Sequence, residues 1–264
     1  MSEEKKMSFL DHLEELRWRL VRCAIAVLIF AISIWCYQEW IMDNVFLSMS
    51  KSDFITFRYM CDIFGICSED ISLKMQSTTL SGQFSYALMM SFLGGLVLSF
   101  PYIFYQIWSF VKPGLKQNEK SMASGIVFYV SLLFFLGISF GYYVVAPLCV
   151  QFFAVFSLSK QIENIPTVSS YMSLVLSTVF YTGLLFLLPV VAYLLGKLGI
   201  ITAQFLRKYR RHSIVGVLIL SAAITPPDII SQIVVSIPIL LLYEIGIFVV
   251  ARVEKNRRKI SEIE

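Results

Sequence analysis

Few side chains of this sequence could take part in chemistry, and the most informative are four acids beside or within apolar stretches. Glu15 precedes the first long apolar run, Glu119 follows the second, Asp228 lies in a tight turn, and Glu244 lies within the last run. A carboxylate can bind a planar guanidinium through two charge-assisted hydrogen bonds. These acids are therefore the first candidates for a functional role.

Each of these positions also has a plainer interpretation. Glu119 shares its loop with three lysines and could be a solvated loop residue, and Asp228 could cap the last helix. A charge at mid-bilayer costs about 2.5–3.5 kcal/mol. Glu244, an intramembrane polar residue, therefore either extends toward the membrane surface or faces protein. Gln232, in the same run, can hydrogen-bond a helix of this chain or of another.

Motifs of catalysis are absent from the sequence, which contains no G-x-S-x-G, no H-E-x-x-H and no phosphate loop. Its two histidines lie outside the apolar runs, and its five cysteines lack the spacing of a zinc site. We therefore expect no enzyme, no metal site and no cofactor. Cys61 and Cys67 share a hydrophilic segment, in which a disulfide or two free thiols remain open alternatives.

Residues 8–22 must position Glu15, and they predict a short acidic amphipathic helix at the start of the first apolar run. Ser8 and Asp11 are typical of a helix start with a capping box. Four leucines recur at spacings of three and four, which places them on one side of a helix: Leu10, Leu13, Leu16 and Leu20. A merely solvated start to a membrane protein is the plainer alternative.

The composition indicates an integral membrane protein, because 57% of the 264 residues are hydrophobic, only 15% are charged, and the mean hydropathy is +0.73. We expect an all-α protein with a cytoplasmic segment at 1–19, a transmembrane domain at 20–251 and a basic tail at 252–264. Its six predicted spans lie at about 20–40, 83–110, 122–147, 171–195, 213–224 and 229–251. The fifth, of about 12 residues, reaches about 18 Å against a hydrocarbon core of about 30 Å.

The basic residues predict the orientation. Of the 22 Lys and Arg residues, all but Lys51, Arg58, Lys74 and Lys160 fall on the side of the amino terminus. Basic residues concentrate on the cytoplasmic side, so both termini are expected in the cytoplasm. Because the charges separate by loop, the net charge of +4 gives no reason to expect a nucleic-acid partner.

The order of motifs resembles the twin-arginine translocase TatC family over about residues 8–252. These motifs are HLEELR at 12–17, FPY at 100–102, YQIWSF at 105–110, PGL at 113–115 with Glu119, FLG at 135–137 with Phe140, Tyr142 and Pro147, TPPD at 225–228 with Ser231 and Gln232, and EIG at 244–246. Each motif is weak alone, whereas their common order is specific.

The resemblance implies a concave, glove-like bundle with short fifth and sixth helices, in a bacterial inner membrane. It implies a receptor for twin-arginine signal peptides that exports folded proteins, driven by the proton-motive force. The implied peptide-binding residues are Glu15, Leu16, Arg17, Phe110 and Glu119.

The resemblance also implies partners, namely TatA-like and TatB-like single-span proteins in a homo- and hetero-oligomer within the lipid bilayer. Their contacts would involve Thr225, Asp228 and Gln232. The sequence departs from the family at Leu187, where many relatives carry a glutamate, so no role of that acid transfers. The alternative function is a small-solute transporter or channel, which needs polar residues converging from several spans; only Glu244 and Gln232 are available, on one span.

Overall fold

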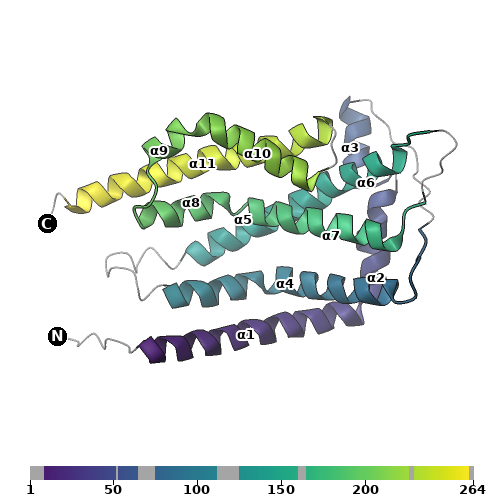
Figure 1. The fold of residues 1–264 in the computed structure, drawn as a ribbon, viewed down its shortest axis with the longest axis horizontal. Coiled ribbons are helices and arrows are strands. Elements are labelled where there is room, and N and C mark those ends of the chain that lie inside the picture. Colours follow the sequence, from purple (N-terminus) through teal and green to yellow (C-terminus); the bar gives the residue numbers. More distant parts are fainter. Residues whose placement is uncertain are drawn as a thin grey trace. The chain divides into compact units, whose positions relative to one another are not determined.

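The structure, a computed structural model, describes residues 9–51, 53–64, 75–111, 125–159, 165–225 and 229–261, and in this part it is helical without strands (Figure 1). The elements are α1 (Phe9–Cys36), α2 (Gln38–Ile41), η1 (Met42–Phe46), η2 (Leu47–Ser50), α3 (Ile55–Phe64), α4 (Gly82–Val111), α5 (Ile126–Phe140), η6 (Gly141–Val145), α6 (Ala146–Val155), α7 (Val168–Leu185), α8 (Leu188–Lys197), α9 (Ala203–Lys208), α10 (Arg210–Ile224) and α11 (Ile229–Ser261).

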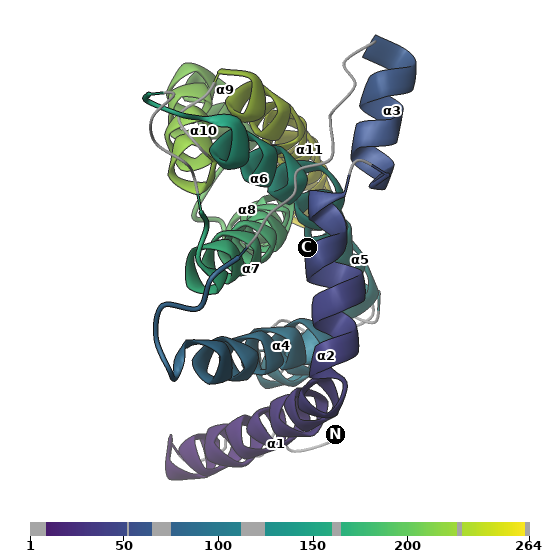
Figure 2. The ribbon, with the colours of Figure 1, turned by 90° about the vertical axis from the view of Figure 1, so that its right-hand side faces the viewer.

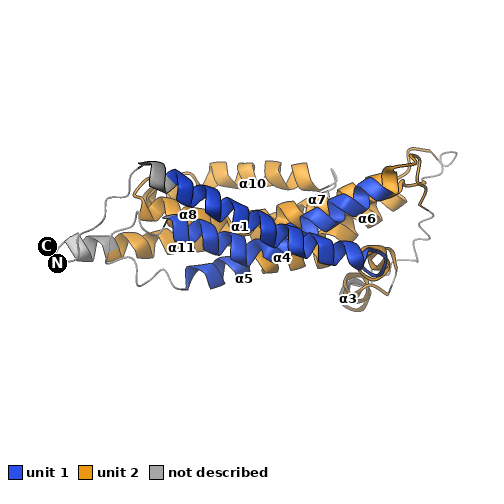
Figure 3. Ribbon diagram, turned by 90° about the horizontal axis from the view of Figure 1, so that it is seen from below, with its two compact units in different colours: residues 1–41, 84–132 blue, residues 42–83, 133–264 orange. Residues whose placement is uncertain are grey.

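The chain divides into two compact units, coloured separately in Figure 3. Unit 1 comprises Met1–Ile41 and Phe84–Leu132, and unit 2 comprises Met42–Gln83 and Leu133–Glu264. The boundary falls inside α5, so each unit is described by itself below.

Unit 1 is built on α1 and α4, which run side by side (Figure 1). Gly95 of α4 lies against the backbone of α1: a Cβ there would come within 2.8 Å of the Ala31 nitrogen and 2.9 Å of the Val27 carbonyl oxygen. Only a residue without a side chain allows this approach, because both neighbouring atoms belong to the backbone. Close approach through small residues is typical of helix packing in membranes.

Within the part of the chain that the structure describes, five helical segments are long and apolar enough to cross a membrane: Leu13–Cys36, Gly82–Phe110, Ile126–Val155, Val168–Lys197 and Ser231–Asn256. The predicted fifth span corresponds to α10, which has 15 residues and is not among them.

The short last helix implied by the family resemblance is wrong, because α11 has 33 residues. It continues past the apolar run into the basic tail. No glycine or proline follows Gly246, and Lys, Arg and Glu are good helix formers.

The third long helix does not end at Pro147, contrary to the predicted boundary of the span, but continues through η6 and α6 to Val155. A wide turn precedes the proline, in which the Ala146 N–H donates to the Gly141 carbonyl five residues earlier. Proline has no N–H for the Tyr143 carbonyl, four residues before it. The Thr56 hydroxyl donates to that carbonyl instead.

The segment 41–82, between the first two predicted spans, is partly helical, since it contains η1, η2 and α3. Two tyrosines of the long helices of unit 2 bind its backbone: the Tyr142 hydroxyl donates to the Val45 carbonyl at 2.9 Å, and the Tyr171 hydroxyl donates to the Phe46 carbonyl. Hydrogen bonds from residues 97 and 125 positions further along the chain therefore hold this segment against the long helices of unit 2.

The cysteines of this structure fall into two classes. Cys61, in α3, is disulfide-bonded. Cys67, the other cysteine of the same hydrophilic segment, lies outside the described residues. Cys23, Cys36 and Cys149 are not disulfide-bonded.

The core of unit 2 gathers residues from η6, α6, α10 and α11, namely the buried Val145, Cys149, Val217, Val235 and Ile239. The fourth long apolar segment is broken at Phe186 and Leu187, just before Pro189. Beyond the break, α8 packs along α11 (Figures 1 and 2). Gly196 permits this packing, because a Cβ there would come within 3.1 Å of the Val250 side chain.

The glycine contact in unit 1 gives a testable prediction. We expect Gly95→Ala to lower stability by about 1–3 kcal/mol, because the added methyl group must separate two backbones. Gly216→Ala is the matched control in α10, where a Cβ would meet nothing within 4 Å; it should be neutral or stabilise the helix by up to about 1 kcal/mol. Thermal unfolding in detergent micelles measures both. Equal melting temperatures for the two variants would contradict the packing described here.

Candidate functional site

The first candidate site lies in unit 1, where Glu15 on α1 is held by Arg19, one turn further along the helix. The Arg19 Nε donates to Glu15 Oε1 at 3.0 Å, and its Nη2 donates to the same oxygen. The Arg19 Nη1 donates to the backbone carbonyl of Gln106 on α4 at 3.1 Å. The two side chains are only 18% and 29% exposed for Arg19 and Glu15, respectively. One arginine thus joins the predicted acid to the neighbouring helix.

The register of α1 against α4 brings Glu15 level with Phe110. Arg19 contacts Gln106 and Ala31 lies against Gly95, so the two helices run antiparallel. Glu15 lies one turn before Arg19, and Phe110 lies one turn after Gln106. The acid and the aromatic ring, 95 positions apart in the sequence, therefore belong to the same end of the helix pair.

The other predicted peptide-binding residues lie around this point with different accessibility. Leu16 is half-buried, whereas Arg17 is exposed. Phe110 is half-buried at the last turn of α4. Glu119 lies outside the described residues, so its position relative to Glu15 stays a prediction.

The second predicted set belongs to the α10–α11 hairpin of unit 2. The Gln232 amide donates to the Leu218 carbonyl at 3.2 Å, which binds α11 to α10 within one chain. Thr225 is buried, and its hydroxyl donates to the Ser221 carbonyl at 2.8 Å. Asp228, between them in sequence, lies outside the described residues.

Glu244 has a partner that the sequence did not suggest. Its Oε2 accepts a hydrogen bond of 2.6 Å from Nη2 of Arg210, the first residue of α10. Both side chains are about half exposed, at 41% and 50%. Since Gln232 and Glu244 each bind a group on α10, these polar residues of α11 serve the hairpin rather than converging on a common point.

The segment before α10 is tied to α11 by further hydrogen bonds. The Tyr243 hydroxyl donates to the Leu206 carbonyl at 2.8 Å, and Glu254 Oε1 accepts from the Ala203 N–H, at the start of α9, at 3.2 Å. A carboxylate at a helix amino terminus is favourable because of the unpaired N–H groups there. The basic segment between α8 and α10 is thereby held against the last helix.

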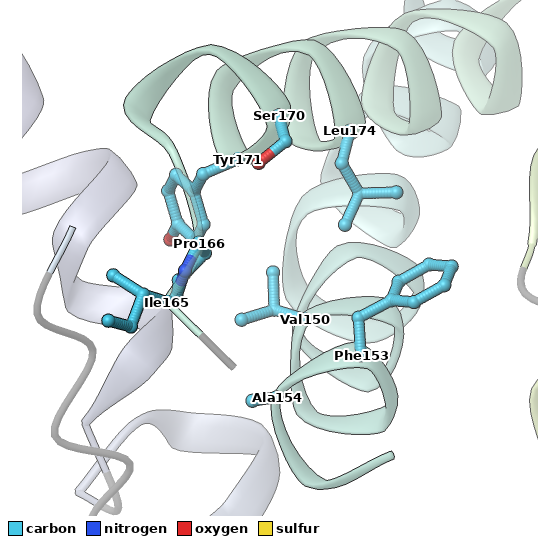
Figure 4. Close-up of a pocket in the computed structure, with 8 residues that line it drawn as sticks. All are labelled: Val150, Phe153, Ala154, Ile165, Pro166, Ser170, Tyr171 and Leu174. Atoms are coloured by element: carbon cyan, nitrogen blue, oxygen red, sulfur yellow. The ribbon is translucent and has the colours of Figure 1, made fainter. Parts of the chain in front are cut away.

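A cavity of about 370 Å³ lies in unit 2 between α6 and the start of α7 (Figure 4). Its lining is mostly apolar: Val150, Phe153, Ala154, Ile165, Pro166, Ser170, Tyr171 and Leu174. The hydroxyl of Tyr171 is used by the Phe46 carbonyl. None of the predicted site residues that the structure describes lines it. Among the described residues no group of three or more His, Cys, Asp or Glu side chains could hold a metal ion.

Comparison with known proteins decides the family. Residues 11–238 match the model of the TatC family, Sec-independent protein translocase protein. The chain belongs to the TatC family. It is therefore related to components of a protein translocase, and its apolar helices fit a membrane protein.

Individual TatC relatives align over nearly their full length. The chain is 37% identical to the Sec-independent protein translocase protein TatC of Blattabacterium sp. subsp. Periplaneta americana (strain BPLAN), over 97% of this chain and 99% of that one. It is 34% identical to TatC of Desulforapulum autotrophicum, over 99% and 90%. The crystal structure of the twin arginine translocase receptor TatC in DDM aligns with a TM-score of 0.69 and 29% identity, covering 90% of this chain and 98% of that one.

The ion pair between α10 and α11 is testable by charge reversal. We expect Glu244→Arg alone to destabilise the hairpin, because it places two guanidinium groups together, and Arg210→Glu combined with it to restore the contact. Exposed pairs couple by about 0.2–1 kcal/mol, so thermal unfolding of the two single variants and the double variant should show a coupling of this size. Additive effects of the two substitutions would show that the pair does not form.

Proposed function

We propose that this chain is the signal-peptide receptor and core component of a twin-arginine protein translocase. It recognises paired arginines of a signal peptide and takes part in exporting folded proteins across the cytoplasmic membrane, driven by the proton-motive force. Its similarity to a solved structure of a twin arginine translocase receptor supports this role. Membership of a protein translocase family supports it independently.

The observation that carries the proposal is the position of Glu15. Its carboxylate is partly buried and lies at the same end of the α1–α4 pair as Phe110. Here it already binds one guanidinium, that of Arg19. A carboxylate that accepts hydrogen bonds from an arginine of its own chain can accept them equally from an arginine of a peptide. Glu119 would supply the second carboxylate, and Leu16, Arg17 and Phe110 would contact the rest of the peptide.

We propose a six-span topology in a bacterial inner membrane, with both termini in the cytoplasm, flanked by segments 1–19 and 252–264. The distribution of Lys and Arg supports this orientation. Beside the five long apolar segments, α10 would be the remaining span, and the overall arrangement would be the concave, glove-like bundle implied by the family.

We further propose that TatA-like and TatB-like single-span proteins bind beside the α10–α11 hairpin, in an oligomeric complex. Thr225, Asp228 and Gln232 would lie at this contact. Gln232 has one N–H engaged by the Leu218 carbonyl, and an amide carries two N–H donors and an acceptor oxygen. A partner helix can therefore be bound without breaking the hairpin.

The receptor role predicts a loss of peptide binding when either acid is neutralised. We expect Glu15→Gln or Glu119→Gln to weaken binding of a twin-arginine peptide by about tenfold or more, since each removes a charge-assisted contact worth about 1.5–3 kcal/mol. Glu14→Gln is the matched control, because Glu14 is exposed and adjacent in the same helix. Fluorescence anisotropy of a labelled peptide on purified protein measures the affinities. Normal binding and normal export by both acid variants would rule out the site.

The topology predicts a thin membrane beside α10. Its 15 residues span about 22 Å at 1.5 Å per residue, less than the hydrocarbon core of about 30 Å. We expect a spin label at the middle of α10 to be more accessible to a water-soluble relaxation agent than one at the middle of α1. Equal accessibility at the two positions would remove α10 as a membrane-thinning span.

A further inference from the structure

We propose that Arg19 is an internal competitor at the peptide site: it occupies Glu15 in the free protein, and an incoming arginine must replace it. This proposal rests on the proposed function, since it concerns how that site is regulated. It assigns to Arg19 a role in setting how strongly any cationic ligand binds.

The geometry shows a carboxylate of which one oxygen, Oε1, is already bound by a guanidinium. Two N–H donors of Arg19, Nε and Nη2, converge on a single oxygen of Glu15. This contact uses the same donor type that a peptide arginine would offer. Residues four apart on a helix face each other, so Arg19 lies permanently within reach. A second guanidinium at Glu15 meets either an occupied oxygen or the repulsion of an adjacent positive charge.

Arg19 also has another partner when it releases Glu15. Its Nη1 donates to the Gln106 carbonyl, little more than one turn from the end of α4 at Val111. The carboxyl-terminal end of a helix favours a nearby cation. The guanidinium can therefore remain bound to α4 while Glu15 turns to a ligand. Without this carbonyl, release would leave a partly buried charge unpaired, which is costly.

An internal competitor lowers the affinity of all ligands of Glu15 by the same factor. The free energy for displacing Arg19 is the same whether an arginine or a lysine arrives, so the ratio of the two affinities does not change. What changes is occupancy at a given concentration. A ligand that also contacts a second acid gains enough binding free energy to offset the cost of displacing Arg19. A cationic ligand without this second contact stays largely unbound at the same concentration. Arg19 thereby lowers the occupancy of the site by weakly bound cations, without changing the ratio of the affinities.

The experiment compares Arg19→Gln with wild type in peptide binding by the purified full-length chain in detergent. The probes are a synthetic signal peptide with two adjacent arginines and the same peptide with two lysines. We expect both affinities to rise by the same factor, about threefold to tenfold. Arg22→Gln is the matched control, because it removes the same charge from an exposed position of α1. It should leave both affinities within about twofold.

A second comparison tests whether Arg19 acts through Glu15. In a Glu15→Gln background, Arg19→Gln should bring no gain, because nothing remains to compete for. The competitor role is refuted if Arg19→Gln lowers the two affinities or leaves them unchanged. It is also refuted if Arg19→Gln raises them no more than Arg22→Gln does. If wild-type binding does not depend on Glu15 at all, the proposed function itself fails instead.

One further variant covers the case in which Arg19→Gln does not accumulate in the membrane. Arg19→Lys keeps the positive charge and can still bind the Gln106 carbonyl, but it loses the two-donor hold on Glu15. We expect a smaller rise of both affinities by a common factor. A fall in affinity for this variant would also refute the proposal.

Discussion

In hydrocarbon, every backbone polar group must find its hydrogen-bond partner within the protein, and this constraint governs how the chain accommodates proline. Each proline in a long helix removes one donor. The loss of this donor has different consequences at Pro147 and at Pro189. At Pro147 a wide turn and the Thr56 hydroxyl take over, so the helix continues. At Pro189 the helix breaks and restarts as α8. Continuity of the apolar segments therefore depends on what lies beside each proline.

Two of the charged contacts between helices of this protein involve the end or the start of a helix. Glu15 and Arg19 bind α4 near its last turn, and Arg210 begins α10 while binding Glu244. Between these ends the helices approach through small residues, as at Gly95, where no side chain intervenes. This division lets the apolar middle of each helix pack by shape. The charged groups add contacts between particular helices, α1 with α4 and α10 with α11.

The long apolar helices and the family could be predicted from the sequence, because a run of about 20 apolar residues has few alternatives. Glu15 could be singled out as a candidate from the sequence motif around it. Its partner Arg19 counts in the sequence only as one more basic residue, although its spacing of four from Glu15 is a visible signal. The same holds for Arg210, which lies between the predicted fourth and fifth spans.

Other features depend on contacts between distant parts of the chain. Helix α6 could not be expected after Pro147, because the donor that replaces the missing N–H comes from Thr56. The helical turns of residues 42–50 are held by Tyr142 and Tyr171. Neither contact has a local pattern in the sequence. The length of α11, in contrast, escapes prediction when the end of an apolar run is equated with the end of a helix.

The bonded state of Cys61 has a consequence for how the protein is assembled. A disulfide persists where the surroundings are oxidising, and the bacterial cytoplasm keeps thiols reduced. In the topology proposed above, the segment with α3 lies outside the cytoplasm, and it would have to cross the membrane before its sulfur could be oxidised. In that topology the redox state of Cys61 would record whether the first hairpin of the chain has been inserted into the membrane.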